Sequence, residues 1–145
     1  MIGLDTSFLV GLTIREHPAH AACMELFQTR IQGVESSAAI CAQILGEFTH
    51  VVTDRRRFSQ PLEIADALSI CSQWWQAVEC RIVEPTPHSF PLFIDWMQRH
   101  RLGRKRVLDT LLAATYHSAG IKRIATTDWR DFECFGVFEI HRLGG

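Results

Sequence analysis

The 145-residue chain lacks any long apolar run, and its first residues lack the basic and then apolar pattern of a signal peptide. A transmembrane helix needs about 20 consecutive apolar residues, so these two absences predict a cytoplasmic protein without membrane association. No linker, low-complexity tract or internal repeat interrupts the sequence. Its length suits one domain, 1–145, with a core that needs no disulfide or structural metal for stability.

The cysteines and histidines also lack the paired spacing of a zinc site. Five cysteines without a CxxC pair favour reduced, mostly buried thiols over a disulfide framework. His17 and His20 have a ligand-like separation, but no matching pair occurs elsewhere in the chain. We therefore expect a solvated helix start at these histidines, with no metal role.

A net charge of −1 lacks the basic excess that is typical of nucleic-acid-binding proteins. Positive charge nevertheless collects in the segment 101–106, where Arg104, Lys105 and Arg106 directly precede a helical pattern. Such runs are more often solvated surface, but this one is placed where a polyanion could be attracted despite the neutral total. These three residues are therefore candidates for binding a polyanion such as RNA.

Four acidic residues stand where hydrophobic elements end or turn: Asp5, Glu47, Asp109 and Asp128. Asp5 and Asp128 each follow a short apolar run that predicts a strand, and in open α/β folds this edge of the sheet binds ligands. Glu47 and Asp109 lie on or beside apolar helical faces, where an unpaired carboxylate is costly to desolvate. A shared cation would explain all four positions.

Each acid taken alone also has an ordinary structural explanation. Asp5 and Asp128 could cap the turns that follow them. Asp109 in the first turn of a helix is favourable by about 0.3–1 kcal/mol through the helix dipole, and Glu47 could be a boundary residue. Their joint order favours the shared site.

Hydrophobic periodicity predicts alternating strands and helices. Strands are expected at 2–4, 34–40, 81–84, 122–127 and 137–140, and helical patterns at 21–27, 44–52, 61–78, 93–97 and 108–119. A polar turn is expected at 5–7. This alternation favours an α/β fold with a mostly parallel sheet and helices on both faces.

Four segments, in order, resemble the PIN-domain family, in particular the small ribonuclease toxins of VapBC toxin–antitoxin pairs. They are residues 2–10, 43–48, 107–114 and 124–132. Each segment alone is a weak match, but their order is fairly specific and spans nearly the whole chain. The resemblance implies a three-layer PIN-like fold and a metal-dependent endoribonuclease that hydrolyses RNA phosphodiester bonds.

The resemblance places the catalytic acids at the four positions singled out above. It adds Asp131 as a nearby fifth acid, and many family members carry Asn where Asp128 stands. A Mg²⁺ or Mn²⁺ ion accepts such oxygen ligands, and we expect Asp5 and Asp109 as principal ligands, with Asp128 and Glu47 completing the site or holding waters. Crowded acids repel one another, so at least one should have a raised pKa without metal.

Two hydroxyl residues, Thr6 and Thr126, match family positions that could orient a carboxylate or a metal-bound water. The resemblance further implies an RNA substrate, a cognate antitoxin and a homodimer. Substrate choice is expected in the segments 53–62 and 98–106, which look individual to this chain.

Other functions fit the residues less well. A haloacid-dehalogenase-like phosphatase needs a second aspartate where Ser7 stands, and a phospho-receiver domain needs a paired acidic site that Asp5 does not provide. A dinucleotide-binding domain needs a G-x-G-x-x-G motif after the first strand, which is missing. A non-catalytic PIN-like RNA-binding or scaffold protein remains the main alternative.

Overall fold

The fold is an α/β sandwich, seen in a computed structural model that describes residues 1–144. Its strands are β1 (Ile2–Leu4), β2 (Ala38–Ile40), β3 (Cys80–Ile82), β4 (Arg123–Thr126) and β5 (Glu139–Arg142). Its α-helices are α1 (Thr6–Thr13), α2 (His20–Leu26), α3 (Ala42–Val52), α4 (Ile64–Gln76), α5 (Ser89–Arg99), α6 (Val107–Ser118) and α7 (Arg130–Glu133). A π-helical turn η1 (Phe27–Ile31) extends α2, and a 3₁₀ turn η2 (Arg104–Arg106) precedes α6.

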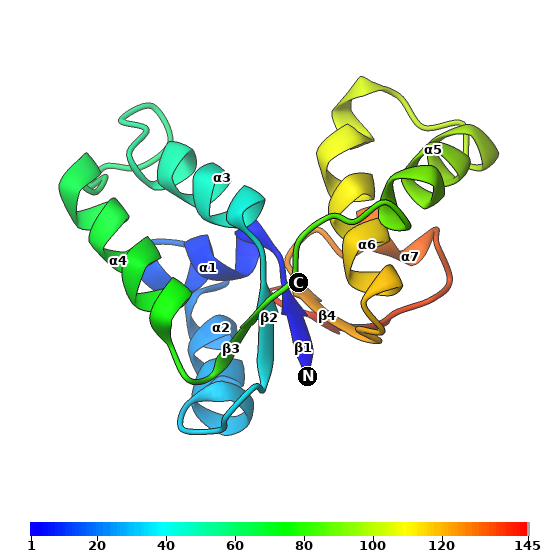
Figure 1. Cartoon of the computed structure of the whole chain (residues 1–145). Helices are drawn as coiled ribbons and strands as arrows, with labels where there is room; N and C mark the ends of the chain where they lie inside the picture. Colours follow the sequence, from blue (N-terminus) through cyan, green and yellow to red (C-terminus); the bar gives the residue numbers. More distant parts are fainter. Residues whose placement is uncertain (145) are drawn as a thin grey trace.

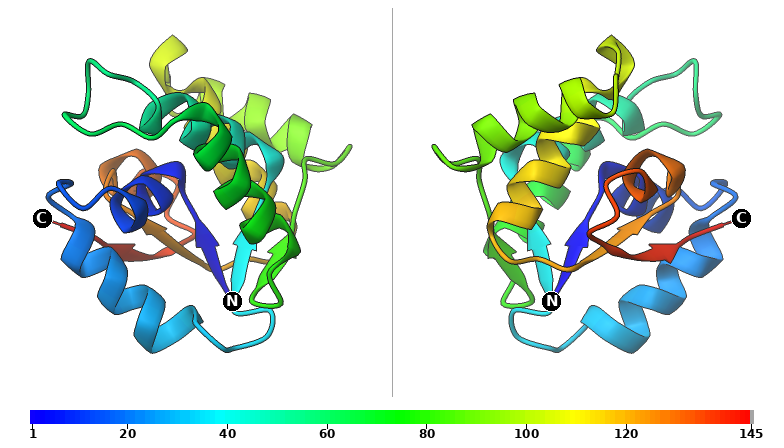
Figure 2. Two further views of the ribbon diagram at one scale, coloured as in Figure 1. Left: turned by 90° about the vertical axis from the view of Figure 1, so that its left-hand side faces the viewer. Right: turned by 90° about the vertical axis from the view of Figure 1, so that its right-hand side faces the viewer.

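The five strands form one sheet in the order β3-β2-β1-β4-β5, and every neighbouring pair is parallel. Helices α1–α4 lie on one side of this sheet and α5–α7 on the other (Figures 1 and 2). The expected α/β class and three-layer arrangement are therefore confirmed. Because all strands run in one direction, their carboxyl ends open at one common edge of the sheet.

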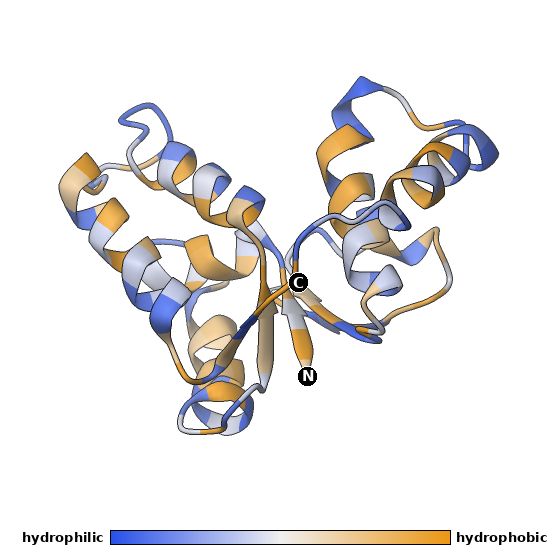
Figure 3. Cartoon of the chain, viewed as in Figure 1, coloured by the Kyte–Doolittle hydropathy of each residue, from blue (hydrophilic) through white to orange (hydrophobic). Residues whose placement is uncertain are grey.

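Apolar residues follow the strands and the helix faces that cover them (Figure 3). The strands β1 and β2 are buried at every position, as expected for a parallel sheet covered on both faces. None of the helices formed by residues 1–144 is long and apolar enough to cross a membrane. All five cysteines are free thiols, as expected, although Cys134 is exposed and only Cys23 and Cys41 are fully buried.

The central strand β1 packs directly against α6. Tyr116 is fully buried, and its hydroxyl group donates to the carbonyl oxygens of Leu4 at 2.7 Å and Ala39 at 3.0 Å. The ring covers Gly3 so closely that a Cβ atom there would lie 2.7 Å from Cδ2 of Tyr116. Gly3 is therefore required for the close approach of β1 and α6.

The structure differs from the sequence-based expectation at several element boundaries. The polar turn expected at 5–7 is absent, because α1 begins at Thr6, directly after Asp5. The last strand begins at Glu139, two residues later than predicted, and the short helix α7 was not predicted. Leu108, the first residue of the apolar helical pattern expected at 108–119, is 51% exposed. Short apolar runs fit strands and helix turns equally well, so periodicity alone does not locate these boundaries.

We expect Gly3→Ala to destabilise the protein by about 2 kcal/mol or more, because the fully buried ring of Tyr116 has no space to move away. Chemical denaturation monitored by circular dichroism measures the change. The control is Gly46→Ala in α3, where an added Cβ meets nothing within 4 Å. Because alanine is the better helix former, this control should raise stability by about 0.5–1 kcal/mol. A stable Gly3→Ala protein would contradict the packing described here.

Candidate metal centre

Asp5 joins the end of β1 to the start of α1 and is only 4% exposed. Its side chain does not cap α1, which contradicts the simple capping explanation. Instead, one carboxylate oxygen, Oδ2, accepts hydrogen bonds from the hydroxyl groups of Ser7 and Thr126, each at 2.8 Å. Thr126 lies at the carboxyl end of β4, so these bonds connect the ends of two neighbouring strands. Oδ1 is left without a side-chain hydrogen bond in the described part of the chain.

Glu47 lies one and a half turns into α3 and is held by one side chain from α1 and one from α3 itself. Its Oε2 accepts a hydrogen bond from the hydroxyl group of Thr6 at 3.0 Å, and its Oε1 accepts one from the amide of Gln43 at 3.0 Å. The same amide also donates to the carbonyl oxygen of Leu108 at 3.0 Å. Gln43 therefore connects α3 with the first turn of α6.

Asp109 lies in the first turn of α6, as the sequence predicted. Within residues 1–144 its carboxylate forms no hydrogen bond or ion pair. Burial, and to a smaller extent the negative charges of Asp5, Asp131, Glu47 and Asp128, together raise its pKa from the ordinary value of 3.8 to about 7. These four acids are therefore close enough to Asp109 to repel it.

Asp128 and Asp131 approach from the segment that follows β4. Asp128 donates its backbone N–H to the hydroxyl oxygen of Thr126 at 2.9 Å, and its side chain reaches solvent. Its pKa is still raised, first by partial loss of hydration and then by the charge of Asp131. Asp131 faces Arg106, whose Nε lies 3.5 Å from its carboxylate and whose Nη2 donates to its backbone carbonyl oxygen.

The acids fit a hard divalent cation by their chemistry. All are oxygen donors, and burial raises the pKa of Asp5 to about 6 despite the two hydroxyl donors. As they stand, no three acidic, histidine or cysteine side chains of residues 1–144 are grouped closely enough to hold an ion directly. Mg²⁺ usually retains several waters, so a spread set of carboxylates suits it better than it suits a tetrahedral metal. The expectation of a raised acid pKa is confirmed.

Two residues of this site were missed from the sequence. Ser7, which we used only to argue against a phosphatase, donates to Asp5 and accepts the backbone N–H of Thr127 at 3.0 Å. Gln43, the first residue of the segment 43–48, was assigned no role from the sequence. Its spacing of four residues from Glu47 places both on one helix face, and this is the signal that would have identified it.

The three basic residues before α6 do not share one environment. Arg104 and Lys105 are exposed on η2, whereas Arg106 is only 22% exposed and faces Asp131. Its Nε is buried without a hydrogen-bond partner among the described residues. Arg106 therefore lies against the acidic cluster, while Arg104 and Lys105 remain open to solvent.

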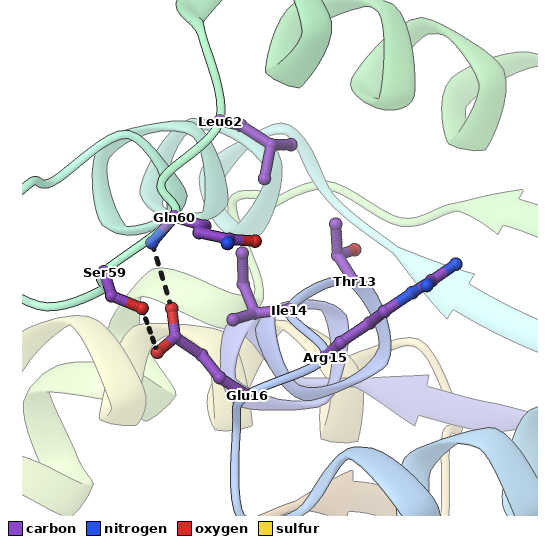
Figure 4. A pocket seen from close by; sticks show the side chains of 7 residues that line it. All are labelled: Thr13, Ile14, Arg15, Glu16, Ser59, Gln60 and Leu62. Atoms are coloured by element: carbon purple, nitrogen blue, oxygen red, sulfur yellow. Dashed lines mark hydrogen bonds between the residues drawn. The ribbon is translucent and has the colours of Figure 1, made fainter.

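A hollow of about 480 Å³ lies away from the acids, between the end of α1 and the segment before α4 (Figure 4). Glu16 crosses it and accepts hydrogen bonds from the hydroxyl group of Ser59 at 2.8 Å and the backbone N–H of Gln60 at 3.2 Å. These bonds lower the pKa of Glu16. The hydrogen bonds of Glu16 in this hollow therefore anchor the 53–62 segment to the end of α1. The hollow does not contribute to the metal centre.

Comparison with known proteins gives one family and several relatives. The PIN domain family model matches residues 2–135. Ribonuclease VapC24 from two strains of Mycobacterium tuberculosis is 25% identical over 140 residues, which cover 97% of this chain and 94% of the relative.

Solved structures share the fold over their whole length. VapC20 of M. tuberculosis, a sarcin–ricin loop cleaving toxin, superposes with a TM-score of 0.74 at 20% identity and covers 97% of this chain and 99% of its own. VapBC-1 of nontypeable Haemophilus influenzae gives 0.65 at 11% identity, with 98% of each chain covered. FitAcB of Neisseria gonorrhoeae gives 0.60 at 15% identity, with 97% of each covered.

We expect the metal-free protein to lose stability as pH rises from about 4 to 7. The folded state raises the pKa of Asp5 to about 6 and of Asp109 to about 7. It therefore holds protons that the unfolded chain has already released, and ionisation works against folding in this window. In EDTA at pH 8, Asp109→Asn should be more stable than the wild type by about 1 kcal/mol after allowance for solvent screening, or roughly 3–5 °C in Tm.

Thermal melts from pH 4 to 8 measure this effect. The control is Asp66→Asn, because Asp66 occupies the same first-turn position of α4 but is exposed. This control should lose stability with pH as the wild type does. An Asp109→Asn protein that also behaved like the wild type would show that Asp109 does not feel the other acids.

Proposed function

Because the chain belongs to the PIN-domain family, we propose that it is a metal-dependent endoribonuclease and the toxin of a toxin–antitoxin pair. The observation that carries this proposal is the half-buried carboxylate of Asp109, which has no hydrogen-bond or ion-pair partner in the described residues and whose pKa is raised by burial and by the charges of the other four acids. An acid in this position destabilises the protein unless a cation neutralises it. The name of the relative VapC24 as a ribonuclease supports the reaction type.

Each acid has a distinct role in this proposal. Asp5 and Asp109 would hold the cation, Asp5 through the oxygen that the hydroxyl groups leave free. Glu47 and Asp128 would complete the site or hold its waters, and Mg²⁺ or Mn²⁺ would be the ion. A bound cation of this kind supplies an activated water and neutralises charge at the scissile phosphate. Thr6, Ser7 and Thr126 keep Glu47 and Asp5 in one orientation.

Arg104 and Lys105 are proposed to bind RNA phosphates. Both side chains are exposed, and both stand immediately before the helix that carries Asp109. Arg106 is engaged with Asp131, so we assign it first to positioning that acid and only then to RNA. Phosphate contacts fix the register of the strand without reading its sequence.

A partner protein is supported by the outer face of α4. Ile64, Leu68 and Trp75 follow one another at helical spacing and are all exposed, with Trp75 44% exposed. The adjacent Trp74 packs edge-on against Phe27, with ring centroids 5.9 Å apart. An exposed apolar stripe of this kind is typical of a protein interface. We propose that it meets the antitoxin or a second copy of the chain, as expected for a homodimer.

We expect Asp5→Asn and Asp109→Asn each to lower RNA cleavage at least about a thousandfold, since each removes a carboxylate that holds the cation. Purified protein is incubated with total RNA and transfer RNA in Mg²⁺ or Mn²⁺, with EDTA as the metal-free arm. Asp66→Asn is the control, because it removes an exposed aspartate from the first turn of α4. Full activity in both site variants would refute the assignment of the acids. No cleavage by the folded wild type would favour the non-catalytic binding protein.

The double variant Arg104→Ala/Lys105→Ala should raise KM about tenfold with little change in kcat, because it removes phosphate contacts outside the reacting atoms. It should also flatten the dependence of log KM on log salt by about 1.4, at ~0.7 for each contact to a single strand. The matched control is Lys122→Ala/Arg123→Ala, an adjacent basic pair at the opposite end of the sheet. Equal KM values and equal salt slopes in the two double variants would show that Arg104 and Lys105 are solvated surface residues without a role in RNA binding.

A further inference from the structure

A second basic group borders the metal centre on its β5 side, and no role has been assigned to it. The indole ring of Trp129 follows Asp128 directly and lies under two guanidinium groups. The Cζ atom of Arg142 is 3.9 Å from the ring centroid and that of Arg130 is 4.7 Å from it. Cation–π contacts of this kind hold an arginine in place without neutralising its charge.

The register of the sheet brings this group to the metal centre. Arg142 is paired with Thr126 in the β4–β5 ladder, and the hydroxyl group of Thr126 donates to Asp5. Arg142 therefore stands at the carboxyl edge, one strand away from the acids. At the opposite end of the same ladder, Arg123 is paired with Glu139.

The two arginines differ in how their charge is used. Arg142 forms an ion pair with Glu133, with Nη2 2.8 Å from Oε1. Arg130 is exposed and forms no ion pair within residues 1–144. A hollow of about 240 Å³ is lined by residues 127–131, which include Arg130 itself as well as Asp128 and Asp131. The free positive charge of Arg130 therefore lines the same hollow as two of the site acids.

A polyanion that reaches these acids needs positive charge beside them, because the acids themselves repel it. Arg106 faces Asp131 and Arg142 is paired with Glu133, so neither charge is fully free. Arg104 and Lys105 supply free charge from the α6 side, and Arg130 supplies it on the β5 side, with Arg142 beside it over Trp129. Both guanidinium groups are already ordered by Trp129, so less side-chain entropy is lost when they bind a phosphate.

We propose that Arg130 and Arg142, held over Trp129, bind a backbone phosphate of RNA next to the scissile bond. The proposal rests on the nuclease function proposed above, and it names a contact of that same site. The ligand is a phosphodiester group, because guanidinium groups bind phosphate oxygens through paired N–H donors. The two arginines position the strand on the opposite side of the acids from Arg104 and Lys105.

The test measures binding separately from cleavage. All variants are made in the Asp5→Asn background, and the probe is a fluorescein-labelled 12-nucleotide single-stranded uridine RNA, followed by fluorescence anisotropy at increasing salt. Arg130→Ala/Arg142→Ala should weaken Kd about tenfold and lower the slope of log Kd against log salt by ~0.7, the loss of one phosphate contact. Arg142→Lys keeps the charge and should keep most of that slope.

Arg123→Ala is the matched control, because Arg123 is a strand arginine paired with a glutamate and is 43% exposed, against 52% for Arg142. It should leave Kd and the salt slope unchanged.

The outcomes separate this site from the nuclease proposal. Loss of binding in the double variant supports the site even if no RNA is cleaved by the wild type. An unchanged Kd in the double variant, or no binding of the probe by the parent, overturns it even if cleavage is normal. A 12-residue polyglutamate peptide that binds more tightly than the RNA, and only when both arginines are present, would assign the surface to an acidic partner protein and also overturn it.

Discussion

The hydroxyl group of Tyr116 joins α6, which carries Asp109, to β1, which leads into Asp5. It donates to Leu4, the last residue of β1, and to Ala39 in β2. Tyr116 lies two helical turns after Asp109 on the same face of α6, and Leu4 directly precedes Asp5. The separation of Asp5 and Asp109 is thus set by a buried contact, which Gly3 permits because it has no side chain. The geometry of the centre therefore depends on packing beneath it.

This packing acts against electrostatic repulsion. Five carboxylates lie near one edge of the sheet, within range of one another's charge, and the chain stabilises them unequally. The hydroxyl groups of Ser7 and Thr126 donate to Asp5. The side chains of Thr6 and Gln43 donate to Glu47, and Arg106 faces Asp131. Asp109 receives no such partner in the described residues, and its pKa rises to about 7, against about 6 for Asp5. The unfavourable ionisation of this residue is the main physical argument for the cation that we propose at this site.

The sequence predicted what depends on local pattern and missed what depends on contacts between distant segments. Asp5 and Asp109 were placed correctly, because each directly follows a recognisable strand or begins a strongly periodic helix. The bond from Thr126 to Asp5 and the turn of Arg106 toward Asp131 join residues that are far apart in the chain. No periodicity reveals them. The start of α1 was missed because Phe8, Leu9 and Val10 fit a strand as well as a helix turn.

The net charge of −1 conceals a separation of charge that the fold creates. The acids converge on the carboxyl edge, while Arg104, Lys105 and Arg130 are exposed around it. In the proposed function, an RNA strand that approaches this edge would meet these exposed cations near the carboxylates. At physiological salt, charges separated by more than the ~8 Å screening length interact only weakly, whereas charges a few ångströms apart still interact strongly. A nearly neutral chain can therefore attract a polyanion toward an acidic centre, which composition alone argued against.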